Sequence, residues 1–145
     1  MERTRRAARA ASPWLLFADG AARGNPGPAA YGFVLDDPEG RPKAAVGRVL
    51  GVATNNVAEY QALIAGLNCA LEQGALELEV RMDSELVVRQ MTGVYRVKNA
   101  GLKPLFEEAQ RLAQKFRSFG IAHVRREHNA RADLEANKAL DAGGR

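Results

Sequence analysis

Four carboxylates stand at chain junctions that are far apart in the sequence. They are Asp19, Glu59, Asp83 and Asp133. Each lies where a predicted strand or helix begins or ends. Mg²⁺ is a hard cation that prefers oxygen ligands in near-octahedral geometry, and acids drawn from distant segments are one way for a fold to hold two such ions. If these four acids converge, their chemistry suits metal-dependent hydrolysis of a phosphodiester.

Each of the four acids also has an ordinary structural explanation. Asp19 begins an Asp-Gly pair, which is common in turns. Glu59 could complete a capping box in which Asn56 is the cap. Asp83 could be an N-cap, and Asp133 could complement the dipole at the start of the last helix. Only their convergence would therefore indicate a site.

The elements that would position these acids follow the order β-β-β-α-β-α-α-β-α. Strands are expected at 14–18, 31–35, 43–50, 75–82 and 121–125, and helices at 57–71, 84–91, 101–119 and 130–142. A loop rich in Gly and Pro is expected at 20–30. This order predicts an α/β fold with a mixed five-stranded sheet, three antiparallel strands followed by parallel additions, flanked by helices. If the first and fourth strands are neighbours, Asp19 and Asp83 lie side by side at one edge of the sheet.

The length and charge of the chain suit one domain with a basic extension. The chain has 145 residues and a formal net charge of +4. Much of this charge lies in MERTRRAARA, so residues 1–12 are expected to form a basic arm and residues 13–145 a single domain. Without the arm the body is close to neutral, and charge argues only weakly for a nucleic-acid partner.

The remaining composition indicates where the protein works. The lone cysteine, Cys69, excludes a disulfide framework within one chain. No stretch approaches the apolar length needed to cross a membrane, and no long apolar segment follows the basic N-terminus. We therefore expect a cytoplasmic protein with no membrane partner.

The chain contains, in order, the segments FADGAARGNPGPAAYGFVL, TNNVAEYQALIAGL, VRMDSELVVRQMTGVYRVKN and HVRREHNARADLEANKAL. These resemble the successive motifs of type 1 ribonuclease H, with compatible spacing from about Trp14 to Leu140. The likeness is greatest to the short bacterial and archaeal subgroup, because YRVKN leads straight into GLKPL without a basic helical protrusion. The resemblance implies a ribonuclease H-like fold and an endonuclease that hydrolyses the RNA strand of RNA/DNA hybrids, leaving 3′-hydroxyl and 5′-phosphate ends.

The resemblance also assigns roles to the acids and to one histidine. It implies that Asp19, Glu59, Asp83 and Asp133 bind two Mg²⁺ ions, for which Mn²⁺ can substitute. Many members carry a histidine on a flexible loop before the last acid, and His128 is the candidate here. The loop is too short to match cleanly, so an ordinary loop residue is the alternative for His128.

The same resemblance indicates the residues that contact the hybrid. They are Gly24, Asn25, Thr54, Asn55, Asn56, Lys98 and Asn99. The Gly-rich turn would let the backbone approach a minor groove and its 2′-hydroxyls. Thr54 would belong to a pocket for a phosphate of the DNA strand, and Asn55 or Asn56 would contact the hybrid, although helix capping is the plainer role of this run. For Lys98 the alternative is a solvated surface charge.

Other functions remain open on the sequence. The same fold and site could also act on double-stranded RNA, or the chain could be a non-catalytic nucleic-acid-binding module. The four acids argue against a pure binder, because it has no reason to retain carboxylates that repel one another. We expect the protein to act as a monomer.

Overall fold

A computed structural model describes residues 13–143, and the expected basic arm at 1–12 lies outside the described residues. The elements in chain order are β1 (Trp14–Ala22), β2 (Gly27–Asp36), β3 (Pro42–Ala53), α2 (Asn55–Glu72), β4 (Glu77–Met82), α3 (Glu85–Met91), α4 (Lys103–Ala113), β5 (Ser118–His123), the short 3₁₀ helix η1 (Arg126–His128) and α5 (Ala130–Gly143). Apart from η1, the predicted order of strands and helices is confirmed.

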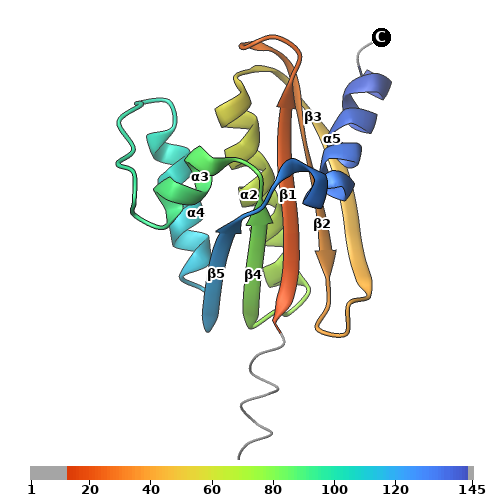
Figure 1. Cartoon of the computed structure of the whole chain (residues 1–145), viewed down its shortest axis with the longest axis vertical. Coiled ribbons are helices and arrows are strands. Elements are labelled where there is room, and N and C mark those ends of the chain that lie inside the picture. Colours follow the sequence, from red (N-terminus) through yellow and green to blue (C-terminus); the bar gives the residue numbers. More distant parts are fainter. Residues whose placement is uncertain (1–12, 144–145) are drawn as a thin grey trace, which may run out of the picture.

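One five-stranded sheet of order β3-β2-β1-β4-β5 forms the centre of the molecule. The pairs β1–β2 and β2–β3 are antiparallel, whereas β4 joins β1 and β5 joins β4 in parallel. Helix α2 packs on β1 and β2, and α5 packs on β1, β2 and β3 (Figure 1). This arrangement confirms the predicted mixed sheet and the predicted pairing of the first and fourth strands.

The core lies between the sheet and helix α2, with α4 beside α2. Leu16 of β1 and Leu63 and Leu67 of α2 are fully buried, and burial of each such side chain contributes about 1.5–3 kcal/mol. A Cβ on Gly66 would lie 2.7 Å from two methyl carbons of Leu16. Glycine at this position therefore lets α2 lie close against β1 and fixes the helix that carries Glu59.

The first two strands are longer than predicted. The expected loop at 20–30 is wrong, because β1 continues to Ala22 and β2 already begins at Gly27. The small residues after Asp19 pair across the two strands, with Ala22 opposite Ala29. Glycine and proline in this segment favour a loop, but here the small side chains allow helices to pack closely on an extended hairpin.

The last helix–strand connection also differs from the prediction. Helix α4 ends at Ala113, whereas the predicted helix continued to Phe119. The rings of Phe116 and Phe119 lie 6.2 Å apart, and strand β5 starts at Ser118 because it pairs with β4. The apolar residues after Ala113 continue a helical spacing, but they belong to the connection and to strand β5.

Within residues 13–143, no helix is both long and apolar enough to span a bilayer.

Candidate active site

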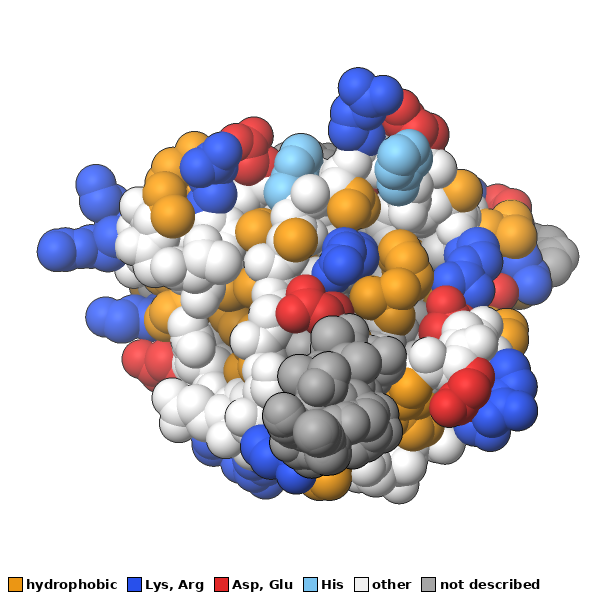
Figure 2. Space-filling view, turned by 60° about the horizontal axis from the view of Figure 1, so that its bottom comes forward, with side chains coloured by type: hydrophobic (Ala, Val, Ile, Leu, Met, Phe, Trp, Pro, Cys, Tyr) orange, Lys and Arg blue, Asp and Glu red, His pale blue; other side chains and the backbone are white. Residues whose placement is uncertain are grey.

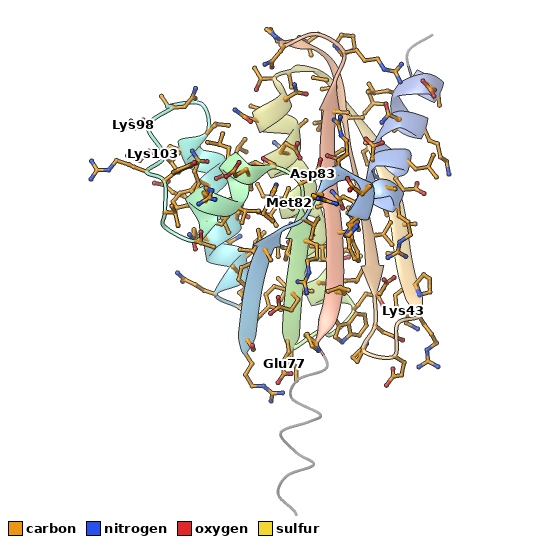
Figure 3. The ribbon with its side chains drawn as sticks, in the orientation of Figure 1. Lys43, Glu77, Met82, Asp83, Lys98 and Lys103 are labelled. Atoms are coloured by element: carbon orange, nitrogen blue, oxygen red, sulfur yellow. The ribbon has the colours of Figure 1, made fainter. Side chains whose placement is uncertain are left out.

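Asp19 and Asp83 lie beside each other where β1 passes the end of β4. The last pair in the parallel register is Ala18 with Met82, so the two aspartates follow at the next position. Figure 3 shows Asp83 just past the end of β4, close to β1 and to the start of α5. The predicted neighbourhood is confirmed, but the expectation that Asp19 ends its strand is wrong, because β1 continues to Ala22.

The segment of β1 beyond β4 brings Glu59 to this place. The backbone amide of Gly20 donates to Glu59 Oε1 at 2.9 Å, and the amide of Ala22 donates to Asn55 Oδ1 at 3.0 Å. Because β4 has ended, the first turns of α2 take up the amides that a longer strand would bond. A Cβ on Gly20 would lie 2.3 Å from the carbonyl carbon of Ala58, so only glycine permits this approach.

The alternative explanation of Glu59, a capping box with Asn56, does not match the structure. Helix α2 is capped earlier than predicted, at Thr54, whose hydroxyl oxygen accepts from the amide of Val57 at 3.2 Å. Glu59 therefore lies in the second turn of the helix, and its carboxylate is free to bond β1. A small shift in the helix start changes this acid from a local cap into a member of the acid group.

Helix α5 brings Asp133 to the opposite side of β1. Gly32 pairs with Asp19 across β1 and β2, and a Cβ on Gly32 would meet Ala132 O at 2.4 Å and Ala136 N at 2.5 Å. The start of α5 is thus pressed against the strand position next to Asp19. Asp133 lies in the first turn of α5, as the sequence predicts.

Burial and mutual repulsion raise the pKa values of two of the acids well above their ordinary values. Asp19 is only 4% exposed, and burial first, then the charges of Glu59 and Asp83, raise its pKa to about 9. Burial also raises the pKa of Glu59 to about 8, with Asp83 adding to the shift and the amide of Gly20 opposing it. Carboxylates in this state favour a nearby cation, because it removes the repulsion between them.

The four acids provide ligands of the type that a divalent metal ion prefers. They offer carboxylate oxygens, which Mg²⁺ and Mn²⁺ prefer, and the raised pKa values show where positive charge would be favourable. Among residues 13–143, however, no three His, Cys, Asp or Glu side chains are already gathered closely enough to hold an ion. Binding would therefore require the carboxylates to turn toward a shared ion.

A hollow of about 320 Å³ lies between the β1–β2 turn, the start of α2 and the segment before α4. It is lined by four of the residues predicted to contact the hybrid: Asn25, Thr54, Asn56 and Asn99. Asn25 Oδ1 accepts from the amide of Asn55 at 3.0 Å, which holds the turn onto the helix. Gly24, in the same turn, has φ +103°, a conformation that favours glycine.

Two other predicted site residues, Lys98 and His128, belong neither to this hollow nor to the turn and helix start beside it. Lys98 lines a separate groove with Tyr95 and Arg96, and Figure 3 shows it on the loop that precedes α4, away from Asp83. His128 is exposed at the end of η1. In the same short helix, Arg126 Nε lies 3.9 Å from Asp83 Oδ2.

The structure adds two asparagines that sequence reasoning missed. Asn129 Nδ2 donates to Asp83 Oδ1 at 2.7 Å, and Asn137 Nδ2 donates to Asp133 Oδ1 at 3.1 Å. Asn129 stands just before the last helix, where asparagine is a favoured cap. Asn137 lies one turn after Asp133, at a spacing that allows contact. Both signals are present in the sequence, but neither indicates a link to the acids.

The chain is similar to known proteins over most of its length. The family described as "Reverse transcriptase-like" matches residues 17–139. A bifunctional protein of Mycobacterium tuberculosis is 48% identical over 133 residues, which are 88% of this chain and 35% of that protein. Ribonuclease HI of Halobacterium salinarum is 47% identical over 123 residues, which are 85% of this chain and 62% of that protein. The chain thus spans only part of the length of these relatives.

Solved structures show the same likeness over nearly the whole chain. RNase H1 from Halobacterium salinarum has a TM-score of 0.87 at 45% identity, over 90% of this chain and 98% of that one. LC11-RNase H1 in complex with an RNA/DNA hybrid has a TM-score of 0.86 at 42% identity, over 91% of this chain and 99% of that one.

Proposed function

We propose a ribonuclease H activity for this chain, which belongs to the type 1 ribonuclease H family. The substrate is the RNA strand of an RNA/DNA hybrid, and the products carry 3′-hydroxyl and 5′-phosphate ends. The observation that carries the proposal is the meeting of Asp19, Glu59 and Asp83 at the end of β4, where burial and then repulsion from Glu59 and Asp83 raise the pKa of Asp19 to about 9. The RNA/DNA hybrid bound by the similar LC11-RNase H1 supports the choice of substrate.

The four acids would hold two Mg²⁺ ions, for which Mn²⁺ could substitute. Such ions supply an activated water for in-line attack on phosphorus and neutralise charge on the leaving 3′-oxygen. The chain itself orients the carboxylates that would bind these ions. The amide of Gly20 orients the carboxylate of Glu59, and Asn137 orients that of Asp133. His128 is exposed at the end of η1, the short helix whose Arg126 approaches Asp83, and it is the candidate for proton transfer to solvent.

The hollow at the start of α2 would bind the nucleic-acid backbone. Its amide side chains, Asn25, Asn56 and Asn99, can donate to phosphate or sugar oxygens without adding charge. The turn that carries Asn25 follows directly on the strand that carries Asp19. A strand whose 2′-hydroxyls lie against this turn would therefore place its phosphodiester at the acids.

The test is a cleavage assay with each strand labelled in turn, in Mg²⁺ and separately in Mn²⁺. It compares RNA/DNA, RNA/RNA and DNA/DNA duplexes of one sequence. The proposal predicts cleavage of the RNA strand of the hybrid alone or foremost. Equal cleavage of RNA/RNA would favour the broader double-stranded RNA activity. Binding of the hybrid without cleavage in either metal would show a binding module and refute the proposal.

A second assay tests recognition of ribose at the turn. Duplexes that carry either one ribonucleotide or a run of them in a DNA strand are compared at equal concentration. Because the neighbouring 2′-hydroxyls are absent around a single ribonucleotide, it should be cut far more slowly than the run. Equal rates on the two duplexes would contradict recognition of a ribose tract at Asn25 and Gly24.

A further inference from the structure

The side-chain amide of Asn129 joins elements that carry three of the acids. This side chain is 1% exposed, between η1 and α5. Its Nδ2 donates to Asp83 Oδ1 at 2.7 Å and to Ala18 O, the carbonyl before Asp19, at 2.9 Å. Its backbone carbonyl accepts from the amide of Asp133 at 3.1 Å. One residue thus links the end of β4, the middle of β1 and the first turn of α5. Figure 1 shows the chain between β5 and α5 passing the end of β4 and crossing β1.

The orientation of this amide follows from its partners. A carbonyl oxygen and a carboxylate can only accept, so the nitrogen of Asn129 must face both of them. The reversed amide would place Oδ1 against two oxygens. In the observed orientation, Asn129 Oδ1 is buried and finds no hydrogen-bond partner among the described residues. A buried polar atom left in this state is unfavourable, so the geometry favours the two donated bonds over satisfaction of the whole side chain.

A neutral donor suits a carboxylate that must also attract a cation. A lysine or arginine beside Asp83 would orient it but would also neutralise its charge and occupy the place of an ion. Asn129 holds Oδ1 and leaves the charge of the carboxylate in place. The nearby cation Arg126 is 3.9 Å from Oδ2, and its side chain is 84% exposed, so solvent screens it.

We infer that Asn129 is a positioning residue for the acid site: its amide fixes the orientation of Asp83 and ties the start of α5 to β1, so that the acids receive divalent cations at the right spacing. The inference rests on the proposed metal-dependent function and deepens it. Asn129 acts through Asp83 and Asp133 and has no contact with substrate of its own. Residues that orient metal ligands in this way typically change metal affinity or activity about 10- to 100-fold when they are replaced.

The test compares Asn129→Ala and Asn129→Ser with the matched control Tyr60→Phe. The control also removes a buried hydrogen bond, the one that Tyr60 donates to Gln90 at 2.6 Å, and this bond involves none of the four acids. Mg²⁺ affinity is measured by calorimetry on the full-length protein without nucleic acid. Thermal melts in EDTA and values of kcat and KM on a labelled hybrid complete the set.

Asn129→Ala should weaken Mg²⁺ binding about 10-fold or more and lower kcat by a similar factor, with little change in KM. Asn129→Ser keeps one short donor and should be intermediate, so it serves if the alanine variant does not fold. Tyr60→Phe should lower the melting temperature and leave Mg²⁺ affinity unchanged.

Wild-type Mg²⁺ affinity and kcat in both Asn129 variants, with melting temperatures lowered as in Tyr60→Phe, would make Asn129 purely structural and overturn the inference. If the wild-type protein itself neither binds Mg²⁺ nor cuts the hybrid, the proposed function fails, and this inference fails with it.

Discussion

The acid site and the loop between α3 and α4 are built in opposite ways. At the acid site, backbone amides of β1 and close helix contacts at Gly20 and Gly32 fix the positions of the acids. In the loop, Val94 and Tyr95 are 60% and 44% exposed, and Arg89 lies over the ring of Tyr95 at 5.7 Å. The acid site is therefore held by the fold, whereas the loop presents its side chains to solvent.

The two regions also differ in charge. Carboxylates gather at the acid site, while the hollows beside the loop are lined by Arg96, Lys98 and Lys103 and by no acid among the described residues. Lys and Arg side chains project from this side of the molecule, at the left of Figure 2. Acids carried on closely packed elements suit the placement of cations, and long basic side chains suit contact with a phosphate backbone. We expect changes at the first region to abolish chemistry and changes at the second to weaken binding.

The largest effect is expected at the acid site. Asp83→Asn should lower the rate of hybrid cleavage by about 10³-fold or more, because it removes a negatively charged metal ligand. Such a ligand contributes several kcal/mol to stabilisation of the transition state. Its melting temperature should be unchanged or higher, since repulsion on Asp19 and Glu59 is relieved. Glu108→Gln, which removes a surface carboxylate on α4 that is paired with Arg111, is the matched control. Near-wild-type cleavage by Asp83→Asn would contradict the expectation that changes at the acid site abolish the chemistry.

A pH-dependent melt in EDTA isolates the repulsion itself. The pKa values of Asp19 and Glu59 are raised from 3.8 and 4.5 to about 9 and about 8. The folded protein therefore binds more protons than the unfolded chain between these limits, and stability falls as pH rises. We expect the melting temperature to decrease between about pH 5 and pH 9, by at least about 5 °C.

Two additions sharpen this measurement. Asp19→Asn should flatten the pH dependence, and Mg²⁺ should raise the melting temperature more at the high-pH end, where the carboxylates are ionised. A melting temperature in EDTA that is constant from about pH 5 to pH 9, or that rises, would contradict the assigned repulsion.

The smallest effect is expected in the basic loop. Replacing Arg96 and Lys98 together by alanine should weaken hybrid binding by up to about tenfold and leave kcat unchanged. The salt dependence of log K should become shallower by about 0.9 for each duplex phosphate that the variant no longer neutralises. Lys43→Ala is the control, because Figure 3 places Lys43 at the opposite end of the molecule. Equal salt slopes for the double variant and the wild type would show that the loop does not bind the phosphates.

The sequence predicted the order of elements better than their ends. The β1–β4 pairing and the position of Asp83 followed from apolar runs and from the rules of crossover connections. The true helix start at Thr54 did not, because Thr54, Asn55 and Asn56 are all good caps. The choice among them depends on long-range bonds such as Ala22 to Asn55.

The same limit explains the glycines and Asn129. From the sequence, Gly20 falls in the predicted loop and Gly32 in a predicted strand, since only the packed helices show that a Cβ would clash there. Asn129 is bonded to Asp83 and Ala18, which are 46 and 111 residues away in the sequence. No local pattern carries such information. The family resemblance nevertheless indicates the four acids and four of the residues that line the hollow at α2.

The central claim is that acids from β1, α2, α5 and the end of β4 form one divalent metal site. Anomalous diffraction from crystals of the protein soaked in Mn²⁺ tests it most directly. The account predicts anomalous peaks enclosed by Asp19, Glu59, Asp83 and Asp133, with two ions about 4 Å apart if both are bound. Peaks that occur only elsewhere on the molecule, with these four carboxylates left without an ion, would contradict it.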